Sequence, residues 1–220
     1  MMHLFLVLRN TEVNGPMKQF TKAASPFTLS VAAILVLASF AANNLPKTFT
    51  NLLSRADMVF DAPDSLASTP IIPTHAISYE YAILYPHKNF EIRYDIKPSD
   101  NAWKEYELHK SEMKKGDINT NPDSTFLSTF QTIILNVSGT LPNITEFDKA
   151  SVKQEFNADW GGTVAVVPRK EFAQHYKYCM IVALHKSHQG DAYIFYLADS
   201  PEGFNESVTT VFHALKFKTL

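Results

Sequence analysis

Apolar residues fill both faces of two short segments near the C-terminus. Residues 177–185 (KYCMIVALH) and 192–198 (AYIFYLA) are rich in the β-branched and aromatic side chains that favour strands. The six residues between them are polar and include Gly190, as expected of a hairpin turn. A strand that is apolar on both faces needs cover on both sides. The pattern therefore predicts that this hairpin forms the centre of a sheet.

A second pair of segments, residues 77–85 and 90–97, alternates between apolar and polar positions. In the later segment the apolar residues are Phe90, Ile92, Tyr94 and Ile96, and the charged residues between them are Glu91, Arg93, Asp95 and Lys97. Such alternation is typical of a hairpin with one buried and one solvated face. It predicts a hairpin near the edge of the sheet, with its charged face in water. Residues 163–167 (TVAVV) predict one further strand.

Segments with helical periodicity lie between and after these predicted strands. The spacing of apolar residues and the flanking cap residues predict helices over 102–115, 122–137 and 146–160, and a last helix that begins at Ser200. Together these elements predict an α+β fold: a mainly antiparallel sheet built from two hairpins plus one further strand, covered by about four helices.

The N-terminus has the layout of a secretory signal peptide. A basic stretch at residues 17–22 precedes an almost wholly apolar run of 14 residues, Phe27 to Phe40, and small residues follow at 41–42. A membrane span needs about 20 apolar residues, so this run is short for one. We expect a signal peptide region over residues 1–42, with Met17 as the true start. The alternative is an uncleaved anchor, which would be the domain's only attachment to a membrane.

Residues 43–75 contain four prolines and no sustained periodicity. They predict a tether, with one or two helical turns near residues 48–58, before a single α+β domain at 76–220. With the signal peptide, this layout predicts an exported protein, periplasmic or extracellular.

Composition excludes several classes of function. The chain is 45% apolar and 19% charged, as in ordinary globular proteins, and its net charge is −2. Residues 1–41 carry Arg9, Lys18, Lys22 and Glu12, a net +2, so the remainder carries −4. An acidic domain argues against nucleic acid as a partner. No glycine-rich phosphate loop occurs, and we predict no cofactor.

The sequence from Asn157 to Gly162 (NADWGG) is one candidate binding site. Asn157 and Asp159 offer hydrogen bonds, Trp160 offers a stacking surface, and the glycines permit close approach. The alternative is a glycine C-cap with a core tryptophan, which is the commoner use of such a sequence.

His185, His188 and Asp191 form a second candidate site at one end of the central hairpin. Their side chains are of the type that binds metals, but their spacing matches no established zinc motif. Turns are also commonly polar for solvation alone. No G-x-S-x-G elbow occurs, and Cys179 lies inside an apolar strand. We therefore predict neither a catalytic set nor a metal site.

These observations favour a non-enzymatic exported domain that binds a small ligand or an envelope or extracellular protein. The alternative is an exported hydrolase or metal-dependent enzyme whose site draws on Asp159, His185, His188 and Asp191. The two differ in a geometric requirement. An enzyme site needs the 157–162 turn and the 186–191 turn to converge on one cleft.

Overall fold

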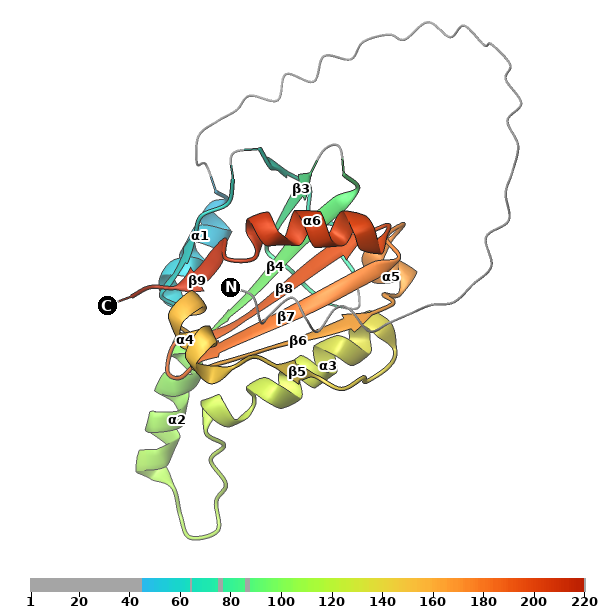
Figure 1. Cartoon of the computed structure of the whole chain (residues 1–220). Helices are drawn as coiled ribbons and strands as arrows, with labels where there is room; N and C mark the ends of the chain where they lie inside the picture. The colour runs from blue at the N-terminus through green and yellow to red at the C-terminus, as the bar shows by residue number, and fades with distance from the viewer. Residues whose placement is uncertain (1–44, 64, 75–76, 86–87, 220) are drawn as a thin grey trace, which may run out of the picture. The chain divides into compact units, whose positions relative to one another are not determined.

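Seven strands form an antiparallel sheet in the order β2-β3-β4-β8-β7-β6-β5 (Figure 1). Their bounds in that order are Ala67–Ser68, Tyr81–Tyr85, Phe90–Pro98, Gly190–Ala198, Tyr178–Lys186, Trp160–Val166 and Thr145–Glu146. Every pair of neighbours is antiparallel. The β7–β8 hairpin lies at the middle of the sheet, which confirms the prediction from its two apolar faces.

The computed structural model describes residues 45–63, 65–74, 77–85 and 88–219, which belong to one unit that runs from Ala42 to the C-terminus. The predicted signal peptide lies outside the described residues. Among the residues that are described, no helix combines the length and apolarity needed to cross a bilayer.

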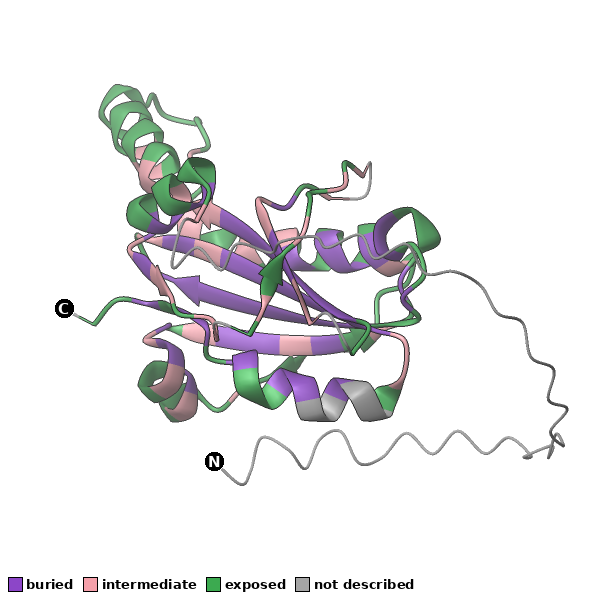
Figure 2. Cartoon of the chain, turned by 90° about the horizontal axis from the view of Figure 1, so that it is seen from above, coloured by how far each residue is buried: buried purple, intermediate pink, exposed green. Residues whose placement is uncertain are grey.

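Helices cover both faces of the sheet. On one face lie α3 (Phe126–Ser138) and the short α5 (Lys170–Ala173), which pack on Ile181 and Phe195 of the central strands. On the other face lie α1 (Lys47–Arg55), α4 (Lys149–Phe156) and α6 (Pro201–Val211), with a two-stranded sheet of β1 (Met58–Phe60) and β9 (Leu215–Phe217). Helix α6 crosses in front of the central strands in Figure 1, and Figure 2 shows that these strands are almost wholly buried.

The charged face of β4 is buried, so the prediction that it is solvated is wrong. Glu91 is 6% exposed, and Arg93 and Asp95 are fully buried. These residues lie beside Leu197, Phe195 and Tyr193 of β8, on the face that α3 and α5 cover. Strand β4 is accordingly an interior strand, next to the central hairpin, and only β3 and β2 lie outside it.

Arg93 shows how the charges on this face are accommodated. Its Nε donates to Glu91 Oε1 at 2.6 Å, and its Nη1 donates to the carbonyl oxygen of Phe172 in α5. The guanidinium also lies 4.9 Å from the ring centroids of both Tyr79 and Phe172. A side chain from the irregular segment before β3 and another from α5 thus cover a face whose alternation is typical of a solvated strand.

The segment predicted as a tether contributes to the fold. Helix α1 lies where one or two helical turns were expected, and its Phe49 and Leu53 are buried. Strands β1 and β2 follow within the same segment. Phe49 stacks on Tyr81 of β3 with 4.7 Å between ring centroids, which joins this segment to the sheet.

Candidate functional site

The two predicted turns lie side by side at one end of the sheet. Trp160, the first residue of β6, pairs with His185 near the end of β7. The backbone N–H of Asp159 donates to the carbonyl oxygen of His185 at 2.9 Å. The backbone N–H of Ser187 donates to Asp159 Oδ2 at 3.1 Å. β-Sheet pairing therefore brings together residues that are 25 or more positions apart in the chain.

Asn157 and Asp159 are engaged in contacts within the domain. Asn157 ends α4 with a left-handed backbone (φ 50°), and its side-chain amide donates to the carbonyl oxygen of Lys218. Asp159 accepts from Lys153 Nζ at 3.1 Å. Partial burial raises the pKa of Asp159, but the Lys153 ammonium and the Ser187 N–H outweigh it, so the pKa lies below its usual value. Both side chains thus hold the turn in place.

Trp160 packs over the sheet beneath α3. Its ring centroid lies 5.1 Å from that of Phe126 and 6.2 Å from that of Phe130. The ring also covers Gly162, where an added Cβ would lie 2.7 Å from Trp160 Cη2. The left-handed cap of α4 is Asn157 and not a glycine, and Trp160 is a partly buried residue that packs against the core.

His185 and Asp191 form a close pair across the β7–β8 hairpin. His185 Nδ1 lies 2.7 Å from Asp191 Oδ1, and the imidazole stacks on the Phe126 ring at 4.2 Å. The hydroxyl of Tyr193 donates to Asp191 Oδ2 at 3.4 Å. A carboxylate at Nδ1 fixes the ring and its tautomer, which is the arrangement found around both catalytic and metal-binding histidines.

Further charged residues, which the sequence analysis did not select, extend this pair. Lys97 of β4 pairs with Asp191, so Lys97, Asp191 and His185 form one row across three strands. Asp95 lies two residues earlier on β4, beside Tyr193, and its Oδ1 is 2.5 Å from Lys97 Nζ. Burial raises the pKa of Asp95 to about 7; the Lys97 ammonium opposes the rise and the Glu80 carboxyl adds to it.

His188 belongs to a different set of contacts. Its ring stacks on Trp103 of α2 (Asp100–Glu112) with 3.8 Å between centroids, and its backbone is left-handed (φ 62°). Asp123, in the 3₁₀ helix η2 (Pro122–Ser124), accepts from the backbone N–H of His188 at 3.2 Å and from the hydroxyl of Ser187. Asp123 Oδ1 also accepts from Trp103 Nε1 at 3.3 Å. These contacts connect the β7–β8 turn to the N-terminal half of α2.

Among the described residues, the His185–Asp191 pair and its neighbours are the titratable groups that the strand pairing places together at this end of the sheet. Within the described part of the chain, no three His, Cys, Asp or Glu side chains are placed to hold a metal ion. A shallow open depression lined by Asp61, Thr210, His213 and Lys216, among others, includes none of the six candidate residues. The two turns lie side by side because they contact each other directly.

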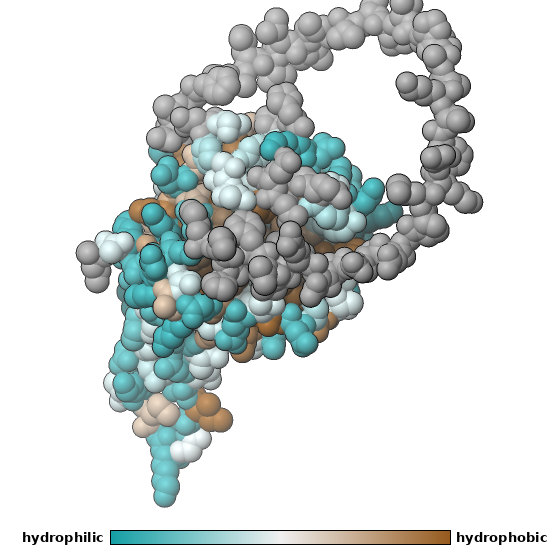
Figure 3. Space-filling view, in the orientation of Figure 1, coloured by the Kyte–Doolittle hydropathy of each residue, from teal (hydrophilic) through white to brown (hydrophobic). Residues whose placement is uncertain are grey.

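Helix α2 is largely exposed along its whole length. We call residues 100–121, the helix and the segment that returns from it, the α2 arm. None of the thirteen residues of α2 is buried, and the arm projects from the end of the sheet (Figure 1). Three large apolar side chains of the arm are exposed: Leu108 (59%), Met113 (41%) and Ile118 (93%). Figure 3 shows one brown group near the lower end of the arm among hydrophilic residues.

The arm is nevertheless ordered by its own hydrogen bonds. Asn119 Nδ2 donates to the carbonyl oxygen of Tyr106 at 2.8 Å, which ties the returning segment to the helix. At the tip, the Lys114 N–H donates to Asp117 Oδ2 at 2.8 Å. At the base, the Arg55 guanidinium binds both carboxylate oxygens of Asp100, at 3.0 and 2.6 Å. The exposed apolar side chains are therefore presented on a defined scaffold.

Comparison with protein-family models, with curated proteins and with solved structures gives no match for this chain.

Proposed function

We propose that this protein is an exported, non-enzymatic binding module whose α2 arm is the surface that contacts a protein partner. The observation that carries the proposal is the exposure of the arm. A helix of thirteen residues is marginally stable in water by itself, and most helices in proteins are stabilised by packing one face. Exposed apolar groups rimmed by polar residues mark interaction surfaces. A partner that covers the arm would supply the packing that the domain does not.

The candidate residues of the two turns support the same choice of surface. Asn157, Asp159, Trp160 and His188 each make contacts that hold the end of the sheet together. A ligand that used these groups would have to replace those contacts, at a cost of about 1 kcal/mol for each hydrogen bond. The arm can be covered without any such loss.

Export is part of the proposal and rests on the sequence of residues 17–42. N-terminal sequencing of the protein recovered from its own export pathway should give a new N-terminus close to residue 42. An intact N-terminus on a membrane-bound protein would instead favour the uncleaved anchor.

Site-specific photo-cross-linking tests the arm as the binding surface. We expect a photoreactive residue in place of Leu108 to form an adduct in cells. The matched control is the same residue in place of Val167, which is more exposed (74% against 59%) but lies outside the arm. Adducts at position 108 alone support the proposal. No adduct at position 108, or equal yields at both positions, would overturn it.

The His185–Asp191 pair favours a second candidate function, an exported hydrolase. Because the Nδ1 of His185 faces a carboxylate at 2.7 Å, its other ring nitrogen is electronically suited to act as a general base. The test is turnover of chromogenic ester and glycoside substrates by wild type and Asp191→Asn. Turnover that Asp191→Asn reduces by about a hundredfold or more would replace the binding-module proposal.

A further inference from the structure

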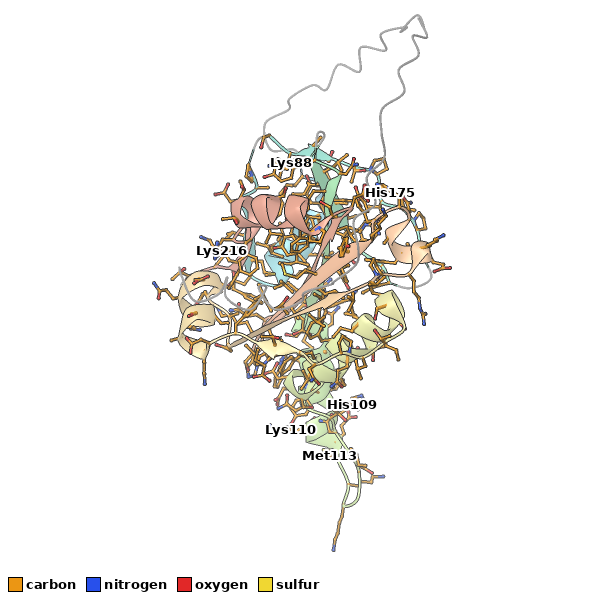
Figure 4. All side chains as sticks on the ribbon, turned by 45° about the vertical axis from the view of Figure 1, so that its right-hand side comes forward. Lys88, His109, Lys110, Met113, His175 and Lys216 are labelled. Carbon is orange, nitrogen blue, oxygen red and sulfur yellow. The ribbon has the colours of Figure 1, made fainter. Side chains whose placement is uncertain are left out.

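We infer that one ordered water molecule binds between helix α6 and the sheet, held by the hydroxyl groups of Tyr94, Tyr196 and Ser207. The site lies inside the body of the domain. It is separate from the α2 arm, on which Figure 4 shows His109 and Met113 beyond the sheet and its covering helices. The inference therefore goes beyond the proposed function and does not depend on it.

Three hydroxyl groups on the α6 side of the sheet are buried without a hydrogen-bond partner among the described residues. Tyr94, Tyr196 and Ser207 each have an exposed fraction of 0%, and their hydroxyl oxygens neither donate nor accept a hydrogen bond there. A buried hydroxyl without a partner gives up its hydrogen bonds to solvent on folding, which is destabilising. Folded proteins satisfy nearly all such groups, and internal water molecules are a common means of doing so.

The two tyrosines are diagonal neighbours on adjacent strands. Tyr94 of β4 pairs with Ile194 of β8, and Tyr196 lies two residues further along β8 on the same face. Diagonal neighbours are about 7–8 Å apart at the backbone, within reach of aromatic side chains. Burial raises the pKa of Tyr94 well above its usual value, and the nearby Tyr196 hydroxyl adds to the rise. The two hydroxyls are thus close but not bonded to each other, which is the separation that a water molecule bridges.

Helix α6 supplies the third hydroxyl. Phe204 in α6 contacts the edge of the Phe90 ring with 6.1 Å between ring centroids. Phe212, just after α6, stacks on Tyr196 at 6.3 Å. Ser207 lies between these two phenylalanines on the same side of the helix, so it faces the strip of sheet that contains Tyr196. Three hydroxyls match the three or so hydrogen bonds that an internal water typically makes.

The surroundings select a neutral occupant. Ile92 pairs with Tyr196, and the rings of Phe90 and Phe212 each lie 6.3 Å from the Tyr196 ring. An ion among these apolar side chains would be buried without an opposite charge, which is strongly unfavourable. A water molecule can donate two hydrogen bonds and accept a third, so it can satisfy all three hydroxyls without any charge.

Removal of one tyrosine hydroxyl tests the inference by the sign of its effect on stability. With the water in place, Tyr94→Phe or Tyr196→Phe leaves the remaining polar groups unsatisfied. The equilibrium constant for unfolding, from urea titration of the purified protein, should then rise about threefold or more. The double variant should unfold about as readily as one single variant, because both hydroxyls act through the same water. Tyr178→Phe is the matched control: its side chain is 40% exposed, and its effect should stay within about twofold.

A crystal structure of the wild-type protein provides the direct measurement. Electron density for one water within hydrogen-bond distance of Tyr94, Tyr196 and Ser207 is the expected result. A direct hydrogen bond between the two tyrosine hydroxyls in that structure would overturn the inference. Tyrosine-to-phenylalanine variants that are as stable as wild type or more stable would also overturn it, because they would show that the hydroxyls have no partner. Two effects that simply multiply in the double variant would exclude one shared water.

Discussion

The Asp95 carboxylate lies 2.5 Å from the Lys97 ammonium, although Asp95 is fully buried and the Lys97 side chain is 43% exposed. Lys97 reaches over the end of β4 and keeps its charge near water, while Asp95 stays inside. One ammonium does not offset the burial of Asp95 beside Glu80, so the pKa of Asp95 rises from 3.8 to about 7. At pH values between about 4 and 7, the carboxyl group of Asp95 is therefore mostly protonated in the folded state and mostly ionised in the unfolded state.

The contribution of Asp95 to the stability of the domain should fall as the pH rises from about 4 to 7. Because the folded pKa of Asp95 is the higher one, its contribution is complete below the unfolded pKa and is lost as the pH passes through about 7. At about 1.4 kcal/mol per pH unit, the loss between pH 4.5 and 7 is about 3 kcal/mol. Urea unfolding of wild type and Asp95→Asn at several pH values measures it.

The free energy of unfolding of Asp95→Asn should lack the part of the pH dependence that comes from Asp95. It should keep the part that the other ionisable groups give to every variant. Asp61→Asn, which removes an exposed carboxylate, is the control and should retain the wild-type slope. Parallel curves for wild type and Asp95→Asn would show that Asp95 is already ionised at low pH.

Removing Arg93 should destabilise the domain strongly. Arg93→Met leaves the buried Glu91 carboxylate without its partner at 2.6 Å, which costs about 3–5 kcal/mol. Arg93→Met combined with Glu91→Leu removes both charges and should recover part of the loss, so the two substitutions should be clearly non-additive. The free energy of unfolding from urea titration gives the coupling.

The exposed Arg55–Asp100 pair provides the comparison for this cycle. Its side chains are about one-third exposed, and Arg55→Met should cost less than about 1 kcal/mol. Equal effects at Arg55 and Arg93 would mean that the Arg93–Glu91 pair is not buried in solution.

The outcome at β4 shows what the sequence could and could not predict. The central hairpin was predictable because its residues are apolar on both faces, a property that depends on no other part of the chain. Whether the charged face of β4 is solvated depends on Tyr79 and Phe172, and Phe172 lies 79 residues away from Arg93. Alternation of polar and apolar residues reports that two faces differ, but it does not report what covers the polar one.

The candidate site was predictable only in part, for the same reason. Local sequence identified the two polar turns, but their contact depends on the pairing of Trp160 with His185, which is a long-range register. Lys97 and Asp95 lie in the same cluster because β4 pairs with β8. A charged residue on a strand beside a fully apolar hairpin is the signal that could have pointed to them.

Gly162→Ala should disturb the packing of Trp160. The new methyl group would lie 2.7 Å from Trp160 Cη2, which is closer than real Cβ contacts, and 3.1 Å from Ile144 Cγ2, which is tighter than most of them. Overpacking of this kind costs about 1–3 kcal/mol. The midpoint of urea unfolding should fall, and the near-UV circular dichroism of tryptophan should change. Gly162→Ala in a Trp160→Leu background should cost much less; an equal cost in both backgrounds would place the strain in the backbone of β6.

Asp123→Ala should loosen the contact between α2 and the β7–β8 turn while the rest of the fold stays intact. The carboxylate accepts hydrogen bonds from Trp103 Nε1, from the Ser187 hydroxyl and from the His188 N–H, so its removal unfastens α2 from the β7–β8 turn. At about 1 kcal/mol for each hydrogen bond, local opening of α2 should become at least about tenfold more frequent. Hydrogen exchange of the amides of residues 100–112 measures this frequency.

The control for this substitution is Asp148→Ala, which removes the N-cap of α4. Asp148 Oδ1 accepts from the Ser151 N–H at 2.9 Å, so this variant should speed exchange in α4 and leave α2 unchanged. If Asp123→Ala left exchange in α2 at its wild-type rate, the arm would be held by the Arg55–Asp100 pair and by its own hydrogen bonds, and the turn at His188 would play no part in presenting it.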